Sequence, residues 1–372
     1  MRILIACDSF KDALPAAEVC RAVAKGIRST HPAAVITEIP LSDGGEGVLD
    51  VLHRALGLQP VTVTVADPLG RPVTASYGMS GDGQTAMVEM AKASGLELLA
   101  EAERDPLKTS TYGTGQLLTD AAARGARRIL LAIGGSATND GGVGAAAALG
   151  WQFLDTEGKP FKPVGGTLQN ITRIVPPAKL PFEQVDVLCD VTNPLYGPNG
   201  ASWIYGRQKG GTDQSLAFLD DALRHVARLV DRENGRGGLG DTPGAGAAGG
   251  LGFGAMVFLG GRLRRGVDMV MELVGFDDAA AQADLIITGE GRLDGQSAQG
   301  KLISGVCAHA GKTPVVALCG KLDASEADIK MIGLKAVYVI NDGDKPLKEM
   351  LAATADDLQK TAAKIITAYS SR

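Results

Sequence analysis

The stretch Ile3-Leu4-Ile5-Ala6-Cys7, followed at once by Asp8-Ser9-Phe10-Lys11, decides how the rest of the chain is interpreted. Five apolar residues in a row are typical of a strand buried on both faces, as in parallel sheets. A helix is expected next, with Pro15 in its first turn. A second strand over residues 35–39 and a second helix over 47–56 complete a strand–helix–strand–helix opening. This alternation predicts a parallel sheet with right-handed crossovers.

The same alternation returns near the C-terminus. Short apolar runs at residues 285–288, 315–319 and 337–340 predict three more buried strands, and an amphipathic helix from Leu347 onward closes the chain. The middle of the chain differs, because residues 61–90 alternate between apolar and polar around Asp67-Pro68-Leu69-Gly70, which predicts a hairpin or meander. Further strands are expected at 129–133 and 185–189, and the glycine-rich residues 231–261 predict a loop followed by a helix of small residues.

These patterns predict an α/β protein of two domains. One doubly wound parallel-sheet domain is expected from residues 1–62 together with 278–372, and a second α/β domain from the inserted residues 63–277. The cleft between two such domains is the usual place for a ligand, so we expect the active site there.

Composition excludes several classes of protein. The 372 residues are 45% hydrophobic and 21% charged, with a net charge of −5, which argues against electrostatic capture of nucleic acid or membrane. The five cysteines have no CxxC spacing and the four histidines no paired spacing, so reduced thiols and no zinc site are expected. The first apolar run is too short for a signal peptide, and no run is long enough to cross a bilayer. We therefore expect a cytoplasmic protein.

Glycine is unusually abundant, with 50 residues that cluster in short runs. Clustered glycines beside apolar strands indicate a backbone that closely approaches a ligand. The alternative is a set of tight turns between short elements.

Polar residues follow each of the first two strands. At the carboxyl ends of parallel strands, where open α/β sheets bind ligands, Asp8 and Ser9 would contact substrate hydroxyls or a metal, and Lys11 would neutralise an anion. The alternative is that Ser9 or Asp12 only caps the following helix. The second strand leads into Asp43-Gly44-Gly45-Glu46, whose carboxylates would bind Mg²⁺ or hydroxyls, or alternatively form a capping box.

The loop of residues 134–144 after the strand at 129–133 is the strongest single segment. Backbone N–H groups at a helix N-terminus, with hydroxyl and amide donors nearby, are suited to phosphate binding. The phosphate-binding residues predicted in this loop are Gly134, Gly135, Ser136, Asn139, Gly141 and Gly142, and Asp140 is a predicted metal ligand. The alternative is glycine-lined packing of a helix. A dinucleotide fingerprint is excluded, because that motif belongs on the first strand–helix turn.

Two more segments supply candidate acids, bases and cations. Asp190 follows the strand at 185–189 and is a candidate general base, although an Asx turn before Pro194 would also explain it. The spacing Gly295-x-x-x-x-Gly300-Lys301 is that of a Walker A loop, but Leu302 stands where Ser or Thr would bind Mg²⁺, so a P-loop is rejected. The dense polar set around it suits a carboxylate-bearing substrate and a phosphate, and consists of Glu290, Arg292, Asp294, Gln296, Ser297 and Lys301.

Together these groups meet the needs of phosphoryl transfer: anion cradles, cations, carboxylates for Mg²⁺ and a base near the acceptor hydroxyl. No nucleophile-elbow motif or suitably placed histidine supports a Ser-His-Asp hydrolase.

The ordered set of motifs resembles the bacterial glycerate kinases of the first type. It comprises Asp8-Ser9-Phe10-Lys11, Asp43-Gly44-Gly45-Glu46-Gly47, the 134–144 loop, Asp190-Val191-Thr192-Asn193-Pro194, residues 244–252 and the 289–301 segment. The resemblance spans nearly the whole chain and implies ATP-dependent phosphorylation of D-glycerate, chiefly at the 2-hydroxyl, on a Rossmann-like domain with a second α/β domain inserted. The chain departs from the family in having Asp12-Ala13 where Gly-Ser is usual, and Ile303 where proline is common.

We therefore expect a Mg²⁺-dependent kinase of D-glycerate. Arg292 or Lys11 would meet the substrate carboxylate, with Asp8, Ser9 or Asp43 on its hydroxyls and Gln296, Ser297 and Lys301 nearby. The ATP phosphates would lie on residues 136–144, Asp140 or Glu290 would hold Mg²⁺, and Asp190 or Asp294 would accept the hydroxyl proton. The rival hypotheses are a kinase acting on the 3-hydroxyl or another sugar acid, a non-catalytic ligand-binding regulator, and a dinucleotide-dependent dehydrogenase.

Overall fold

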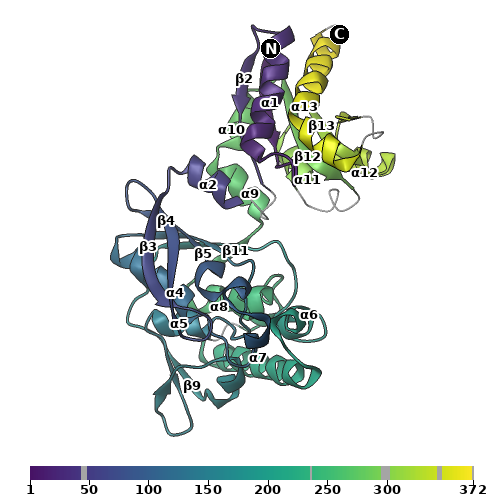
Figure 1. Ribbon diagram of the computed structural model, residues 1–372. Coiled ribbons are helices and arrows are strands. Elements are labelled where there is room, and N and C mark those ends of the chain that lie inside the picture. The colour runs from purple at the N-terminus through teal and green to yellow at the C-terminus, as the bar shows by residue number, and fades with distance from the viewer. Residues whose placement is uncertain (43–47, 235–236, 295–301, 342–345, 371–372) are drawn as a thin grey trace. The chain divides into compact units, whose positions relative to one another are not determined.

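The computed structural model describes residues 1–42, 48–234, 237–294, 302–341 and 346–370. They divide into two compact units (Figure 1), unit 1 from Met1–Leu56 and Gly266–Arg372 and unit 2 from Gly57–Arg265. Each unit has its own sheet flanked by helices, so the predicted α/β fold class is confirmed.

The boundaries between the units differ from those expected at residues 62 and 278. Strand β3 (Gln59–Ala66) pairs along its whole length with β4 (Pro72–Met79), so a boundary at residue 62 would cut through one strand of unit 2. Helix α9 (Gly266–Leu273) packs against α2 and α11 of unit 1 and therefore belongs with them.

Unit 1 is a doubly wound parallel sheet. Among the described residues its strands lie in the order β14-β13-β12-β1-β2, and every neighbouring pair is parallel. All five strands therefore direct their carboxyl ends to the same edge. Its elements are β1 (Arg2–Cys7), α1 (Ala16–Thr30), β2 (Val35–Glu38), α2 (Val48–Ala55), α9 (Gly266–Leu273), α10 (Phe276–Ala281), β12 (Leu285–Leu293), α11 (Leu302–His309), β13 (Val315–Leu322), α12 (Glu326–Ile332), β14 (Ala336–Val339) and α13 (Leu347–Ser370).

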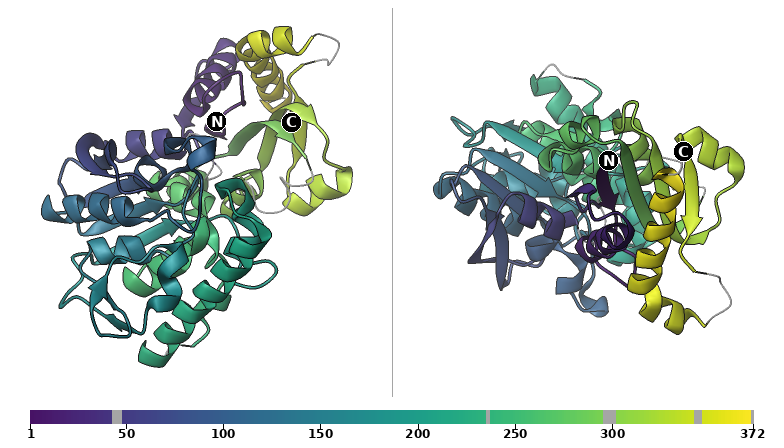
Figure 2. Two further views of the ribbon diagram at one scale, coloured as in Figure 1. Left: turned by 60° about the horizontal axis from the view of Figure 1, so that its bottom comes forward. Right: turned by 90° about the horizontal axis from the view of Figure 1, so that it is seen from above.

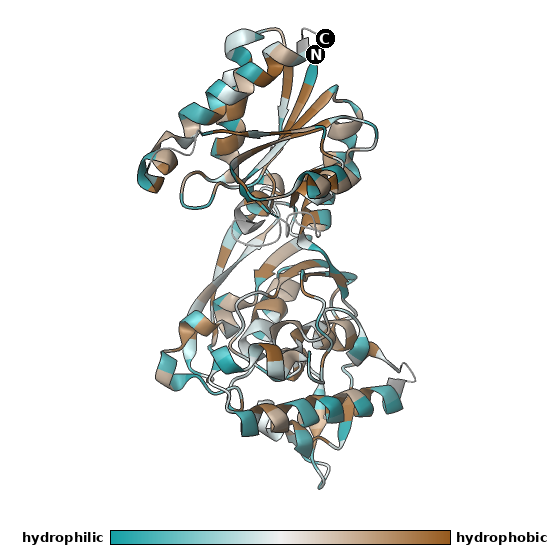
Figure 3. Cartoon of the chain, turned by 90° about the vertical axis from the view of Figure 1, so that its right-hand side faces the viewer, coloured by the Kyte–Doolittle hydropathy of each residue, from teal (hydrophilic) through white to brown (hydrophobic). Residues whose placement is uncertain are grey.

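Helices α1 and α13, from opposite ends of the chain, lie side by side in every view (Figures 1 and 2). Their apolar stripes pack on Ile3, Ile5 and Ile287 of the sheet. The helices approach closely at Gly26, where an added Cβ would lie 2.2 Å from the carbonyl oxygen of Gln359. The central strands are hydrophobic over most of their length (Figure 3), as expected for strands covered on both faces.

Unit 2 contains a six-stranded mixed sheet in the order β11-β10-β6-β5-β4-β3 and a small antiparallel sheet in the order β8-β7-β9, counted over the described residues. The predicted hairpin is β3 and β4, whereas β5, β6, β10 and β11 are parallel. The strands are β3 (Gln59–Ala66), β4 (Pro72–Met79), β5 (Thr85–Glu89), β6 (Arg128–Ala132), β7 (Gln152–Leu154), β8 (Pro160–Phe161), β9 (Arg173–Val175), β10 (Gln184–Leu188) and β11 (Arg262–Arg264). The helices are α3 (Ala91–Ser94), α4 (Tyr112–Ala123), α5 (Val143–Ala148), α6 (Ala201–Tyr205), α7 (Asp213–Asn234) and α8 (Ala247–Phe258), with 3₁₀ turns η1 (Leu96–Leu98), η2 (Glu101–Glu103), η3 (Gly165–Asn170), η4 (Arg207–Lys209) and η5 (Leu239–Asp241).

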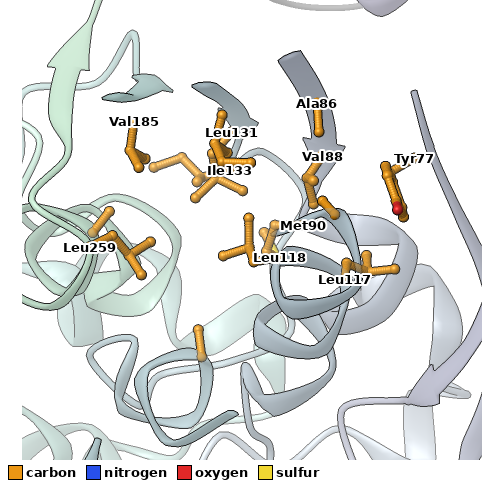
Figure 4. Close-up of a cluster of buried hydrophobic side chains, with 14 of the residues drawn as sticks. Tyr77, Ala86, Val88, Met90, Leu117, Leu118, Leu131, Ile133, Val185 and Leu259 are labelled. Carbon is orange, nitrogen blue, oxygen red and sulfur yellow. The ribbon is translucent and has the colours of Figure 1, made fainter. Parts of the chain in front are cut away.

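One hydrophobic core of unit 2 lies between the large sheet and helices α4 and α8 (Figure 4). Leu131 of the sheet faces Leu118 of α4, and Val185 faces Leu259 at the end of α8. This packing fixes the carboxyl ends of β6 and β10, from which the candidate site residues extend.

The glycines of α8 pack against the loop of residues 134–144. Gly249 has a φ of 67°, and an added Cβ there would lie 1.9 Å from the carbonyl oxygen of Thr138. The N–H of Gly141 donates a hydrogen bond of 3.0 Å to the carbonyl oxygen of Gly249. Here the glycines permit one backbone to pack on another, which is a structural use and not contact with a ligand.

Taking the described part of the chain alone, none of its helices combines the length and the apolar character needed to span a bilayer.

Candidate active site

The carboxyl edge of the unit 1 sheet brings together residues from both ends of the chain. The N–H of Asp8 donates to the carbonyl oxygen of Gly289 at 2.8 Å, so Asp8 follows β1 directly beside Glu290 of β12. The Asp8 side chain is only 9% exposed, and its Oδ1 accepts the N–H of Ser9 at 2.6 Å. Two carboxylates and a hydroxyl therefore lie together at the ends of two central strands.

A tight turn carries Lys11 away from β1. Phe10 and Leu14 exchange backbone hydrogen bonds, and α1 begins only at Ala16, with Pro15 at its N-cap. The alternative that Ser9 or Asp12 caps this helix is therefore wrong. Lys11 is exposed, and the turn lines a pocket of about 740 Å³ in unit 1. Arg54, a residue without a predicted role, adds a second basic side chain to this pocket.

Asp12 occupies a left-handed backbone conformation, with φ at 61°. A side chain makes this conformation costly, although less for Asp than for most residues. Asp12→Gly should therefore raise the free energy of unfolding by about 0.5–1 kcal/mol. Asp12→Ala, which keeps a Cβ, should give no gain. Urea unfolding of the three proteins tests this, and equal stabilities of the Gly and Ala variants would contradict it.

The polar segment that follows residue 288 begins as part of strand β12. β12 continues to Leu293, and its residues Glu290 and Arg292 pair with Cys319 and Lys321 of β13. The extension is possible because Gly291 and Gly320 let the two backbones approach closely, with an added Cβ on Gly320 lying 2.8 Å from the carbonyl oxygen of Gly291. The sequence pattern ended the predicted strand at residue 288, whereas in the structure the pairing with β13 continues to Leu293.

Arg292 already contacts carboxylates of the chain. Its Nε lies 2.7 Å from Oδ2 of Asp323 and 3.9 Å from Oδ2 of Asp294, and Lys321 lies 3.1 Å from the same Asp323 oxygen. Asp323 and Lys321 were not among the predicted site residues, because only the pairing of β12 with β13 reveals that they stand beside Arg292. Within the described residues, this guanidinium is therefore paired with carboxylates of its own chain.

Four predicted substrate-binding residues, Asp43, Gln296, Ser297 and Lys301, lie outside the described residues.

At the carboxyl edge of the unit 2 sheet, Asp190 is level with the glycine loop. Leu188 of β10 pairs with Ala132 of β6, and Asp190 and Gly134 each follow two residues later. Gly134 and Gly135 are exposed, and an added Cβ on Gly134 would meet nothing within 4 Å. Asp190 is exposed as well. Asp190, the predicted base, and the open part of the predicted phosphate loop therefore stand at neighbouring positions.

The rest of the loop is interior. Asp140 is fully buried, and its carboxylate accepts hydrogen bonds from the backbone N–H and the hydroxyl of Thr111, both at 2.8 Å. The N–H groups of Gly142 and Gly144 donate to it at 3.1 and 3.3 Å, so it also occupies the N-terminus of α5. Burial raises the pKa of the Asp140 carboxyl, while these four donors oppose that rise. With both oxygens engaged and no exposed face, Asp140 has the geometry of a loop-holding residue, which argues against the predicted metal ligand.

Other predicted phosphate-binding residues have structural partners too. The side-chain amide of Asn139 donates to the Ser202 hydroxyl at 3.0 Å. Gly141 and Gly142 are covered, with added Cβ atoms meeting Leu223 at 3.1 Å and Gly254 at 3.0 Å. The alternative of glycine-lined packing thus describes residues 139–144, and the turn of Gly134, Gly135 and Ser136 retains access to solvent.

Lys209 of η4 lies beneath this turn and was not predicted. It is 1% exposed, and its Nζ donates to the Ser136 hydroxyl oxygen at 2.6 Å and to the Thr138 carbonyl oxygen at 2.7 Å. Burial lowers the pKa of Lys209 to about 7, while Asp140 opposes the shift.

The lowered pKa of Lys209 makes the stability of the protein depend on pH. Between the folded pKa of about 7 and the unfolded value of 10.5, the unfolded chain binds more protons, so Lys209 makes stability rise with pH. We expect the unfolding free energy of the wild type, relative to Lys209→Met, to rise by up to about 1.4 kcal/mol per pH unit between pH 7 and 9.5. Urea unfolding across this range tests it. Parallel curves for the two proteins would contradict the shift.

Over the described residues, no group of three or more His, Cys, Asp or Glu side chains is placed to hold a metal. The pair Asp8 and Glu290 remains, and Mg²⁺ in phosphoryl-transfer enzymes usually takes one or two carboxylates with the remaining ligands from water and phosphate. The chemistry of these two carboxylates would therefore fit a magnesium ion.

A family model described as the glycerate kinase family matches residues 3–370 of this chain. The chain belongs to the glycerate kinase family. It is 42% identical over 371 residues to the glycerate kinase of Bacillus subtilis (strain 168), covering 98% of this chain and 97% of that protein. It is 40% identical over 371 residues to the glycerate 2-kinase of Escherichia coli (strain K12), with coverage of 98% and 97%.

A solved structure shows the same similarity. The protein assigned as glycerate kinase 2 from Salmonella typhimurium LT2 is 39% identical and matches with a TM-score of 0.87, covering 100% of this chain and 98% of that one. These matches confirm the resemblance drawn from the motifs and, with it, that this member of the glycerate kinase family is a kinase.

Proposed function

We propose that the protein phosphorylates D-glycerate with Mg·ATP at the 2-hydroxyl, giving 2-phosphoglycerate. The observation that carries the proposal is the gathering of Asp8, Ser9, Glu290 and Arg292 at one edge of the unit 1 sheet, in a chain 40% identical to a glycerate 2-kinase. The reaction takes place in the cytoplasm, where ATP is available and thiols stay reduced.

Arg292 binds the glycerate carboxylate in this proposal. Its Nε lies 2.7 Å from Oδ2 of Asp323, so the substrate carboxylate would compete with Asp323 for a guanidinium whose planar set of donors suits carboxylates. Lys11, on its exposed turn, supplies a second cation. Asp8 and Ser9 bind the substrate hydroxyls, and the roles of Asp43, Gln296, Ser297 and Lys301 remain predictions.

Asp8 and Glu290 would hold Mg²⁺. Because Asp8 is also assigned to the substrate hydroxyls, its two carboxylate oxygens would be divided between the ion and those hydroxyls. The ion, when bound, would neutralise charge on the phosphates. Glu290 is therefore the stronger candidate of the two predicted metal ligands, because the oxygens of Asp140 already accept four hydrogen bonds.

The ATP phosphates bind the turn of Gly134, Gly135 and Ser136, whose backbone is open to a ligand. Asp190 accepts the proton of the attacking hydroxyl. We prefer it to Asp294, because Asp190 is level with this turn, whereas Asp294 lies 3.9 Å from Arg292 and helps to neutralise that cation.

The decisive experiment measures ADP release from Mg·ATP by the purified protein, with and without D-glycerate. L-glycerate, glycolate and tartronate serve as matched acids, and a reaction without Mg²⁺ tests the metal requirement. D-Glycerate-dependent ADP release supports the proposal. No release with any of the acids, from protein shown to be folded, would overturn it and favour a ligand-binding regulator.

The position of phosphorylation is tested separately by coupling the reaction to enolase alone. 2-Phosphoglycerate is consumed directly, whereas 3-phosphoglycerate requires added phosphoglycerate mutase. Signal that depends on the mutase would contradict the 2-hydroxyl assignment and favour the 3-hydroxyl.

A further inference from the structure

Lys209 is a buried lysine that contacts no carboxylate directly within the described residues. In the described part of the chain, its Nζ forms hydrogen bonds only with two neutral oxygens, the Ser136 hydroxyl and the Thr138 carbonyl. Burying an ammonium with neutral partners is costly. Asp140 is the carboxylate whose charge acts on it, and its own oxygens accept four hydrogen bonds from Thr111, Gly142 and Gly144.

The backbone around Lys209 allows it little freedom. Gly210, the next residue, has a φ of 89°, and an added Cβ there would lie 2.0 Å from the carbonyl oxygen of Arg104. The backbone of Gly210 at the end of η4 therefore lies directly against the backbone of Arg104. Lys209 therefore meets Ser136 because of tertiary packing and not because of a flexible side chain.

The bond from Lys209 determines how Ser136 can act. Because Nζ donates to the hydroxyl oxygen, the hydroxyl proton of Ser136 must point to a different acceptor. Within the described residues, no such acceptor is found for it. Ser136 is 7% exposed and directly follows the open residues Gly134 and Gly135. An anion on this turn would accept a hydrogen bond from the Ser136 hydroxyl. It would also lie close to the buried ammonium of Lys209.

We propose that Lys209 is a positioning residue that orients the Ser136 hydroxyl as a donor and supplies the buried charge for a nucleotide phosphate on the Gly134–Gly135–Ser136 turn. This inference rests on the proposed function, which assigns the phosphates to that turn. A hydrogen bond polarised by a cation is stronger than a neutral one, and in a buried setting its charge is weakly screened.

The test is run at a pH below the Lys209 pKa of about 7, where the ammonium form prevails. It measures kcat and KM for both ATP and D-glycerate in Lys209→Met, Ser136→Ala and the double variant. Lys209→Met should raise the KM for ATP by about 10-fold or more, with the KM for glycerate changed less than about threefold. Because Lys209 acts through Ser136, the KM for ATP of the double variant should exceed that of the more impaired single variant by no more than about twofold. Lys179→Met, on an exposed lysine of unit 2, is the matched control and should match the wild type.

A merely structural lysine would give a different pattern. It would lower the unfolding midpoint while affecting both KM values alike, or would give independent effects that multiply in the double variant. Either pattern overturns the inference. Should Lys209→Met fail to fold, Lys209→Gln replaces it throughout, since it keeps a donor but removes the charge. If the wild type shows no glycerate-dependent ADP release, the proposed function fails first. If the wild type is active and the KM for ATP is unchanged, only the role of Lys209 fails.

Discussion

Asp190→Asn should lower kcat by on the order of 10²-fold or more while the protein remains folded. Asparagine has nearly the same shape as aspartate but cannot accept the proton of the attacking hydroxyl. The loss corresponds to about 2.7 kcal/mol of barrier height. Because Asp190 is exposed just after the end of β10, the substitution should leave the free energy of unfolding within about 0.5 kcal/mol of the wild type. Steady-state kinetics and urea unfolding on the same preparation give both values.

Asp221→Asn is the matched control, since it makes the same change on an exposed aspartate of helix α7. Its kinetics should equal those of the wild type. Asp294→Asn, made in parallel, tests the other predicted base. Activity of Asp190→Asn within a few-fold of the wild type would remove Asp190 from this role, and a large loss in Asp294→Asn alone would transfer the role to that residue.

Asp140→Ala should lower the free energy of unfolding by about 3–5 kcal/mol. The substitution removes a buried carboxylate and leaves four donors without their acceptor, namely the N–H and hydroxyl of Thr111 and the N–H groups of Gly142 and Gly144. No solvent reaches the position to replace it, because Asp140 is fully buried. Urea unfolding monitored by circular dichroism measures the loss.

Asp155→Ala is the control for this prediction. Asp155 also accepts two backbone N–H groups, from Glu157 at 2.8 Å and Lys159 at 2.9 Å, but it lies in a surface turn. Water can replace it there, so a loss below about 1 kcal/mol is expected. If Asp140→Ala were as stable as this control and instead weakened the dependence of activity on Mg²⁺, the loop-holding role would be wrong and the metal-ligand prediction would regain support.

Much of the fold was predictable because its signals are local. The apolar run of β1, the stripe of α1 and the hairpin of β3 and β4 depend on residues within one element, and each appears where it was expected. The same holds for Asp8, Ser9 and Asp190, since the end of a parallel strand is recognisable from its neighbours in the sequence. Errors arose where one element depends on another. β12 extends through two glycines because β13 pairs with it, and the unit boundaries shift because β3 and α9 pack within their own units.

The sequence by itself determined the α/β class, the order of most strands and helices, the family and the set of polar residues that end the strands. Those properties follow from hydrophobic periodicity and from motifs in which all partners are close in the chain. Tertiary structure alone decided which of the polar residues remain available to a ligand. Asp140 and Lys209 are 69 positions apart in the sequence. The burial of a residue and its hydrogen bonds to residues so distant cannot be recognised from its neighbours in the sequence. Packing placed one carboxylate inside the glycine loop and one ammonium beneath its open turn, because buried polar groups must find partners wherever the chain brings them.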